Sequence, residues 1–214
     1  MLDFAMIEAA RVYDAPYRFI AGEGLISAER GKSIRQTFPV FEEGGFLPLS
    51  QFEITGAFAD LMADLNSRRL AEVLSSKLGV DLVDRPRMIT LRRNSKEGDG
   101  RIHNDSESKI STMLVYLNES WPAGAAGSIR ALNGPDDIDD YTLEVPPLNG
   151  NFFAFARSER SWHGHIPYAG ERLVVQTTFL TSQEALRRKE RSGVFQRIGK
   201  SLVRKLSGRR ANHS

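Results

Sequence analysis

The spacing of apolar residues changes after the first 80 positions. Before that point, apolar residues recur at helical spacing, which predicts helices over 26–37 and 58–78. Ser27 is a good capping residue near the start of the first helix. The polar stretch at 66–69 is a possible break within the second. We therefore expect residues 1–80 to form a helical part of the molecule.

Short apolar runs separated by turn residues follow this helical part, and each run is typical of a strand. The predicted strands cover 88–92, 101–105, 112–117, 128–132, 142–145, 151–156 and 173–180. Seven short strands at near-regular spacing favour a sandwich or barrel. The predicted fold class is α+β: a double-stranded β-helix (jelly-roll) barrel over 81–186, with the N-terminal helices packed on one side.

The composition supports one domain over residues 1–186, because 41% of the 214 residues are apolar and such a chain can bury a sizeable core. The sequence has no run of 18 apolar residues, and the N-terminal segment lacks the basic stretch of a signal peptide. We expect a cytoplasmic protein.

Residues 187–214 form a basic tail with ten Lys or Arg and one acid, a local charge of +9. The whole chain carries +2, so the remainder carries −7. The tail has an apolar stripe at helical spacing, which predicts a basic amphipathic helix. Such a helix either docks on the barrel or a partner subunit, or lies peripherally on an anionic membrane surface. Nucleic acid ranks third, because Phe195 is the tail's only aromatic residue.

The chemistry-bearing residues gather in two short segments. Cysteine is absent, so a metal would be held by nitrogen and oxygen ligands. Three of the four histidines fall in R-I-H-N-D (101–105) and S-W-H-G-H (161–165). On a strand, His103 and Asp105 would share one face. A third ligand from the second segment, His163 or His165, completes a set of two imidazoles and one carboxylate that suits non-haem Fe(II). Taken alone, His-x-Asp is more often a chance surface pair.

Arg172 stands nine residues after His163, at the start of the apolar run L-V-V-Q-T-T-F-L. An arginine here is usually solvated or paired at the surface. If its guanidinium points inward instead, it can bind a dicarboxylate through two parallel hydrogen bonds.

Five pieces of the chain, in order, resemble the prolyl 4-hydroxylase-like branch of the 2-oxoglutarate/Fe(II) dioxygenases. They are H-N-D (103–105), T-M-L-V-Y-L-N (112–118), G-S-I-R-A-L (127–132), V-P-P-L-N-G-N-F-F-A-F (145–155) and W-H-G-H-I-P-Y-A-G-E-R (162–172). The resemblance covers residues 88–180 closely and the N-terminal part loosely.

The resemblance implies an Fe(II)- and 2-oxoglutarate-dependent dioxygenase that uses O2 to hydroxylate an unactivated C–H bond. It places His103, Asp105 and His163 on the iron ligands and Arg172 on the residue that binds the distal carboxylate of 2-oxoglutarate. Tyr116 matches a tyrosine that contacts the same carboxylate in some members, although a buried core aromatic is an equal alternative.

His163 is preferred over His165 because the family's proline follows its ligand by four residues, as Pro167 follows His163. His165 then lies near the metal or faces the substrate. The family often has a tyrosine about ten residues before the first ligand, where this chain has Arg92 and Arg93. An arginine there binds a carboxylate or faces solvent.

The substrate is left open, with a prolyl residue of a protein among several classes, including small molecules. Two alternatives compete with the dioxygenase hypothesis: a non-catalytic binding module on the same barrel, and a cupin-like metal enzyme that does not use 2-oxoglutarate. The first would not need the three ligands, and the second would usually bring more histidines together.

Overall fold

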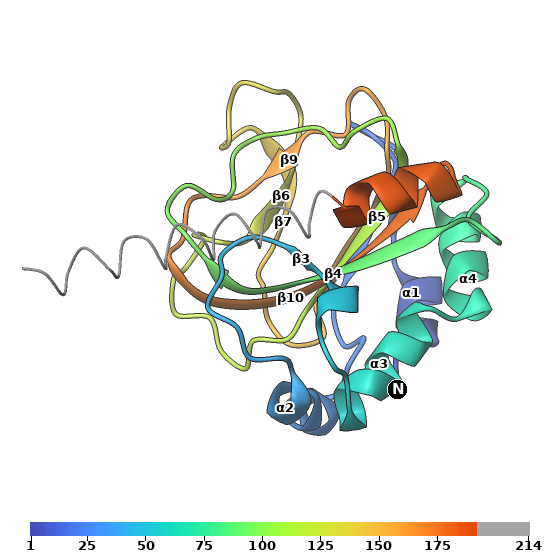
Figure 1. Cartoon of the computed structure of the whole chain (residues 1–214). Helices are drawn as coiled ribbons and strands as arrows, with labels where there is room; N and C mark the ends of the chain where they lie inside the picture. Colours follow the sequence, from blue (N-terminus) through green and yellow to red (C-terminus); the bar gives the residue numbers. More distant parts are fainter. Residues whose placement is uncertain (192–214) are drawn as a thin grey trace, which may run out of the picture.

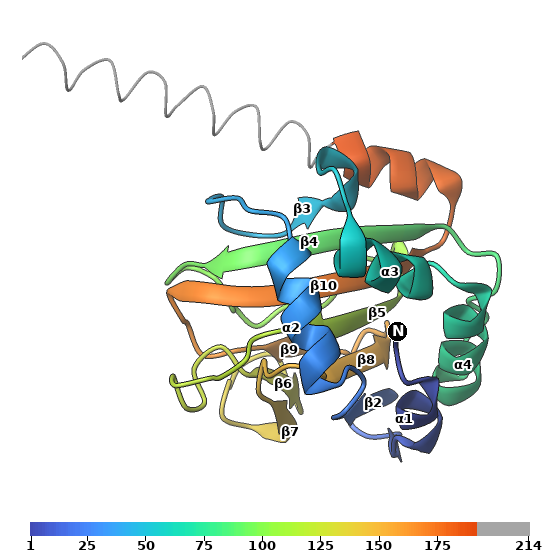
Figure 2. The same cartoon turned by 90° about the horizontal axis from the view of Figure 1, so that it is seen from below.

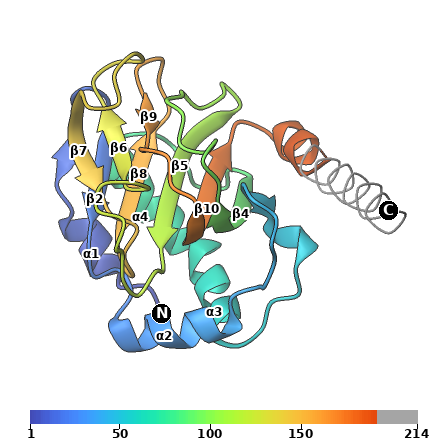
Figure 3. The same cartoon turned by 90° about the vertical axis from the view of Figure 1, so that its left-hand side faces the viewer.

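Two antiparallel sheets form the centre of the structure, a computed structural model that describes residues 1–191. The large sheet has the order β1-β2-β8-β5-β10-β4-β3, and Figure 3 shows its central strands side by side. Its strands are β1 (Val12–Tyr13), β2 (Phe19–Gly22), β3 (Leu47–Pro48), β4 (Arg87–Ser95), β5 (Lys109–Tyr116), β8 (Phe152–Ala156) and β10 (Gly170–Leu180). The small sheet has the order β7-β6-β9, with β6 (Ile129–Leu132), β7 (Tyr141–Val145) and β9 (His163–Gly164).

The helices begin and end at residues whose local chemistry explains the boundary. They are α1 (Phe4–Ala9), α2 (Ala28–Thr37), the short 3-10 helix η1 (Leu49–Gln51), α3 (Gly56–Leu65) and α4 (Arg68–Leu78). The Ser27 side chain accepts a hydrogen bond from a backbone N–H of α2, and Ser67 does the same for α4. Gly79 closes α4 in the left-handed conformation, which glycine adopts without steric penalty. The predicted break at 66–69 is confirmed.

Two apolar cores lie on opposite faces of the large sheet. Figure 1 shows α2 and α3 on the side away from β6, β7 and β9. The helix-facing core joins the helices to one face, and Figure 2, seen from below, shows α2 in front of the strands of the large sheet with α3 beside it. The inter-sheet core fills the space between the large and small sheets and is rich in aromatic residues. Because side chains alternate along a strand, β2, β5, β8 and β10 each contribute residues to both cores.

The predicted strand over 101–105 is wrong: the segment is a loop that pairs with β9 only at His103. Asn104, the residue after His103, donates a side-chain hydrogen bond to the carbonyl of Ser158 at 2.8 Å. The Asp105 carbonyl accepts one from the Arg157 side chain at 3.0 Å. These bonds hold the segment in an irregular path that a ladder would not permit.

The first 80 residues, expected to be helical, also supply the short strands β1, β2 and β3 of the large sheet. These strands have two to four residues, too few for a period of two to be recognised in the sequence. The same holds for β9, which has two residues.

The chain is helical again over residues 183–191, and this terminal helix lies beside η1 and the start of β4 (Figures 1 and 2). The predicted amphipathic tail helix over 187–214 falls largely on 192–214, outside the described residues. Within the described residues, no helix is long and apolar enough to cross a membrane.

Candidate metal centre and adjoining anion site

His103 and His163 face each other across a single backbone bridge. Each backbone N–H donates to the other residue's carbonyl at 3.0 Å, and the ring centroids are 4.2 Å apart. Nδ1 of His103 lies 2.9 Å from the Arg101 carbonyl, and Nδ1 of His163 lies 2.9 Å from the Ser161 carbonyl. Since a carbonyl only accepts, each Nδ1 carries the hydrogen. Each Nε2 therefore keeps its lone pair free for a metal.

Asp105 completes the group, and both of its carboxylate oxygens are fixed. Thr112 Oγ1 donates to one oxygen at 2.6 Å, and Lys109 Nζ donates to the other at 2.6 Å. Burial by itself would raise the pKa of Asp105, but the charges of Lys109 and His163 and the two hydrogen bonds outweigh it. The pKa is lowered to about 2, so the carboxylate is ionised at neutral pH.

One ligand atom from each of His103, Asp105 and His163 lies within 4.8 Å of the other two, close enough for one metal ion to bind all three. Burial, followed by the charge of His103, lowers the pKa of His163 to about 4. A neutral imidazole at pH 7 is the form that binds a metal. The Phe155 ring packs against His163 at 4.6 Å between centroids and excludes water from that side.

A second polar group lies on the same inter-sheet face, toward the C-terminal ends of β4 and β5. It consists of Arg92, Tyr116 and Arg172, and we call it the anion site. Arg92 on β4 and Tyr116 on β5 both pair with Val174 of β10, so the three residues form one row across the sheet. Arg172 lies beside this row, with its guanidinium carbon 5.3 Å from the centre of the Tyr116 ring. Its Nε donates to the Gly127 carbonyl at 2.8 Å.

The anion site carries an excess of buried positive charge. Arg172 and Arg92 are 2% and 8% exposed, and burial followed by the charge of Arg172 lowers the pKa of Arg92 to about 10. Asp99 offers partial compensation, 3.4 Å from Arg92. Within the described residues, the Tyr116 hydroxyl and the Arg92 Nε are buried without a hydrogen-bond partner. An anionic ligand would accept hydrogen bonds from these two donors and would compensate the charge of the two arginines.

His165 lies with the arginines instead of with the three metal-binding candidates. Its Nδ1 is 2.9 Å from the Ile166 carbonyl, and its backbone N–H donates to the Gly100 carbonyl at 2.9 Å. Burial and then the charge of Arg172 lower its pKa to about 4. Gly100 has a φ of +96°, and a β-carbon there would collide with the His165 ring. The loop thus closes tightly over His165.

Thr112 and Tyr116 give the distance between the metal group and the anion site. Thr112 donates a hydrogen bond to Asp105 of the metal group, and Tyr116 belongs to the anion site. They are four residues apart on β5, which is about 13 Å between their α-carbons. Leu114 points to the same face between them and belongs to the inter-sheet core. The intervening floor is therefore apolar, with a metal group at one end and a cation group at the other.

The structure also places residues that the sequence reasoning did not single out. Thr112 shares a face with Tyr116 by strand alternation, so its inward direction could have been found from the sequence. Lys109 offered no such signal, because only the fold brings its ammonium to Asp105. Arg93 points away from Arg92 and pairs with Glu171 at 2.9 Å.

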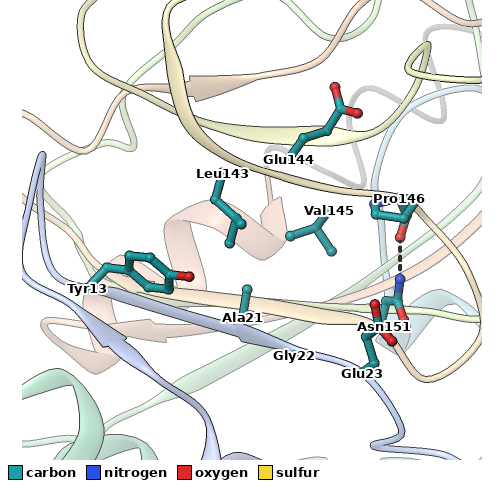
Figure 4. Close-up of a pocket in the computed structure, with 9 residues that line it drawn as sticks. All are labelled: Tyr13, Ala21, Gly22, Glu23, Leu143, Glu144, Val145, Pro146 and Asn151. Carbon is teal, nitrogen blue, oxygen red and sulfur yellow. Dashed lines mark hydrogen bonds between the residues drawn. The ribbon is translucent and has the colours of Figure 1, made fainter.

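A separate hollow of about 160 Å³ lies between β2 and β7 (Figure 4). Leu143 and Val145 face Ala21 across it, and Asn151 donates a hydrogen bond to the Pro146 carbonyl at 3.0 Å. Neither a histidine nor an arginine lines this hollow. It therefore lacks the imidazole and guanidinium groups that form the metal group and the anion site.

The fold is that of solved prolyl 4-hydroxylases. A Pseudomonas putida prolyl 4-hydroxylase superposes with a TM-score of 0.56 at 18% identity, covering 82% of this chain and 97% of that one. A Trichoplax adhaerens prolyl hydroxylase, in complex with a hypoxia inducible factor peptide fragment, gives a TM-score of 0.51 at 14% identity, covering 78% of this chain and 86% of that one. A Phytophthora capsici prolyl 4-hydroxylase gives a TM-score of 0.50 at 19% identity, covering 76% of this chain and 58% of that one. No family model matches the sequence, and no curated protein matches it.

Proposed function

We propose that this protein is an Fe(II)- and 2-oxoglutarate-dependent dioxygenase that hydroxylates an unactivated C–H bond. The observation that carries the proposal is the pairing of two groups on one face of the large sheet. His103, Asp105 and His163 converge at one end, and the buried Arg172 lies at the other. The likeness to prolyl 4-hydroxylases supports the further proposal that the two sheets form a double-stranded β-helix.

His103, Asp105 and His163 are proposed to hold the iron. Two imidazoles with free Nε2 atoms and one ionised carboxylate match the preference of Fe(II) for a facial set of three protein ligands. The Nδ1 hydrogen bonds fix both rings, and Thr112 fixes the carboxylate. When bound, Fe(II) with 2-oxoglutarate and O2 supplies the oxidising power for C–H hydroxylation.

Arg172 is proposed to bind the distal carboxylate of 2-oxoglutarate, with Tyr116 donating its unused hydroxyl. Arg92 is proposed as a second cation of this site, because its buried Nε also lacks a partner. A dianion would relieve the repulsion between the two guanidinium groups. The apolar stretch around Leu114 suits the methylene groups of a dicarboxylate whose other end reaches the metal.

Anaerobic addition of Fe(II) and 2-oxoglutarate tests this function against both alternatives. A dioxygenase is expected to develop a weak visible absorption band that needs both components. A cupin-like enzyme that does not use 2-oxoglutarate would bind iron without the band. A non-catalytic binding module would bind neither, and that result would overturn the proposal.

Arg172→Ala is expected to weaken 2-oxoglutarate binding by about tenfold to a hundredfold, because a charge-assisted contact contributes roughly 1.5–3 kcal/mol. Iron binding should change little, since Arg172 lies in the anion site. Arg172→Lys should restore only part of the affinity, because an ammonium cannot form the two-pronged bond. Titrations that follow the visible band give the 2-oxoglutarate affinity of the wild-type protein and of both variants. An unchanged 2-oxoglutarate affinity in Arg172→Ala would contradict the assignment.

A further inference from the structure

Arg172 lies at an irregularity of β10, where the pairing of this strand with β4 shifts in register. Glu171 pairs with Asn94 and Val174 pairs with Arg92, so three steps along β10 correspond to two along β4. Such a bulge re-aims a side chain, and it leaves the direction of that side chain to contacts outside the paired strands. The contacts made by Arg172 therefore decide where its guanidinium points.

The connection between β5 and β6 supplies such contacts to both the backbone and the side chain of this bulge. Asn118 Oδ1 accepts a hydrogen bond from the backbone N–H of Leu173 at 3.0 Å, which fixes the chain next to Arg172. The Gly127 carbonyl accepts a hydrogen bond from Arg172 Nε at 2.8 Å. An arginine whose Nε is occupied in this way keeps the edge formed by its two terminal nitrogens for a carboxylate.

Gly127 is itself held in one conformation. Its backbone N–H donates to the Ile166 carbonyl at 2.9 Å. Its φ is +77°, in the left-handed region that favours glycine. A β-carbon at this position would lie 2.6 Å from the ring of Trp121, so the indole packs directly against the Gly127 backbone. The hydrogen bond and the ring together set the direction of the carbonyl that holds Arg172.

Trp121 is held by a hydrogen bond and by a second aromatic ring. Its Nε1 donates to the Ala126 carbonyl at 2.8 Å. Its ring packs on that of Tyr168, just before β10, with 4.5 Å between the centroids. Both residues are half-buried, whereas Gly127 and Arg172 are buried. The two rings therefore cover the turn that ends at Gly127 from the outside.

We propose that Trp121 and Tyr168 are positioning residues for the co-substrate. They hold the Gly127 carbonyl, and this carbonyl holds the Arg172 guanidinium in the orientation that binds the distal carboxylate of 2-oxoglutarate. This inference rests on the proposed function and adds to it two residues that lie outside the buried anion site. Binding groups must be held to within about 0.5 Å, so a loosened Gly127 lowers the affinity even though Arg172 is intact.

Trp121→Leu in the full chain is expected to weaken 2-oxoglutarate binding by about tenfold, because a misplaced guanidinium loses part of its two-pronged contact. The anaerobic visible band with Fe(II) gives this affinity. The Fe(II) affinity should stay unchanged, since other hydrogen bonds fix the metal ligands. Trp121→Phe should lose less, because an aromatic ring remains. Tyr141→Leu is the matched control: Tyr141 is an exposed aromatic residue of the small sheet and should affect neither affinity.

Two further measurements separate positioning from a general loss of structure. In the Arg172→Ala background, Trp121→Leu should cause no further loss of 2-oxoglutarate affinity, because the residue through which it acts is absent. In ¹H–¹⁵N spectra of the protein without metal or co-substrate, the Arg172 Nε–H should exchange slowly with water. This exchange should become at least about tenfold faster in Trp121→Leu, since the hydrogen bond to Gly127 is loosened. The signal is assigned by its loss in Arg172→Lys.

Three outcomes would overturn the inference: an unchanged 2-oxoglutarate affinity in Trp121→Leu, an equal loss in the Arg172→Ala background, or a parallel loss of Fe(II) affinity. The Nε–H signal needs no ligand, so it separates this inference from the proposed function. A normal wild-type band with unchanged exchange and affinity in Trp121→Leu rejects only the positioning residues. A missing wild-type band rejects the dioxygenase, whereas faster exchange in Trp121→Leu would still support their hold on Arg172.

Discussion

The two faces of the large sheet are built from alternate residues of the same strands, yet only one of them carries buried charged groups. On β4, Leu91 is fully buried in the helix-facing core, whereas the next residue, Arg92, points between the sheets. The helix-facing core consists of apolar side chains. The inter-sheet face combines aromatic residues with Thr112, Tyr116 and two buried arginines.

This contrast shows how one strand can serve stability and chemistry at once. Apolar burial on the helix side supplies free energy of folding, which offsets the desolvation of charges on the other side. The residues on the two faces can then be changed separately. Variants that change one face test whether stability and ligand binding depend on separate faces, provided that both properties are measured in each variant.

The largest effect is expected from His163→Ala, which should abolish turnover and weaken metal binding severely. Loss of one imidazole leaves two protein ligands, too few for a stable facial site. Iron binding by anaerobic titration and 2-oxoglutarate consumption are the measurements. The same loss is expected for His103→Ala and Asp105→Ala.

His165→Ala is the matched control for the metal ligands, because His165 is equally buried but lies with the arginines. It should retain iron. Iron binding lost in His165→Ala but kept in His163→Ala would reverse the assignment of the third ligand.

On the helix-facing side, Leu91→Ala is expected to lower the free energy of unfolding by about 2–5 kcal/mol, because it opens a cavity in a packed core. Urea or thermal unfolding of the metal-free protein gives the value. The affinity for 2-oxoglutarate should be unchanged at temperatures where the variant is folded. A tenfold loss of affinity would show that the two faces are coupled.

Acid is expected to destabilise the metal-free protein through the inter-sheet face. The pKa values of His163 and His165 are about 4 in the folded protein, below the ordinary value of 6.5. Between these values the unfolded chain binds more protons, so stability falls as the pH drops from about 6.5 to about 4. Each histidine is expected to contribute roughly 1–3 kcal/mol across this window.

Unfolding experiments at intervals from pH 7 to pH 4 measure this slope. His165→Gln should reduce it, because one of the two titrating groups is removed. An unchanged slope in that variant would mean that His165 does not titrate as its burial requires.

Much of the fold could be predicted from the sequence where the periodicity was long. The helices near 26–37 and 58–78 and the strand ending at Leu180 follow directly from apolar spacing and capping residues. The two-residue strands β1, β3 and β9 could not, since a period needs several residues to be recognised. The segment 101–105 was misread because its path is set by hydrogen bonds to distant residues such as Ser158.

The residues of the candidate site were predictable in type but only partly in arrangement. His-x-Asp and the distant histidine indicated a metal set, and the spacing to Arg172 indicated an anion partner. Whether Arg92 or Arg93 points inward depends on the register of β4 with β10, which the sequence leaves open. The contact between Lys109 and Asp105 also depends on how the loop folds.

The smallest effect concerns Arg92, the nearest neighbour of Leu91 on the opposite face. Arg92→Met is expected to weaken 2-oxoglutarate binding by about tenfold, because one of two proposed cations is lost. The free energy of unfolding should stay constant or rise, since the change removes a buried charge that Arg172 repels. Arg93→Met is the matched control, because Arg93 forms a more exposed pair with Glu171 and should affect neither property by more than about 1 kcal/mol. If Arg92→Met instead destabilises the protein as much as Leu91→Ala and leaves 2-oxoglutarate binding intact, Arg92 is structural. The two faces of β4 would then share the work of stabilising the fold.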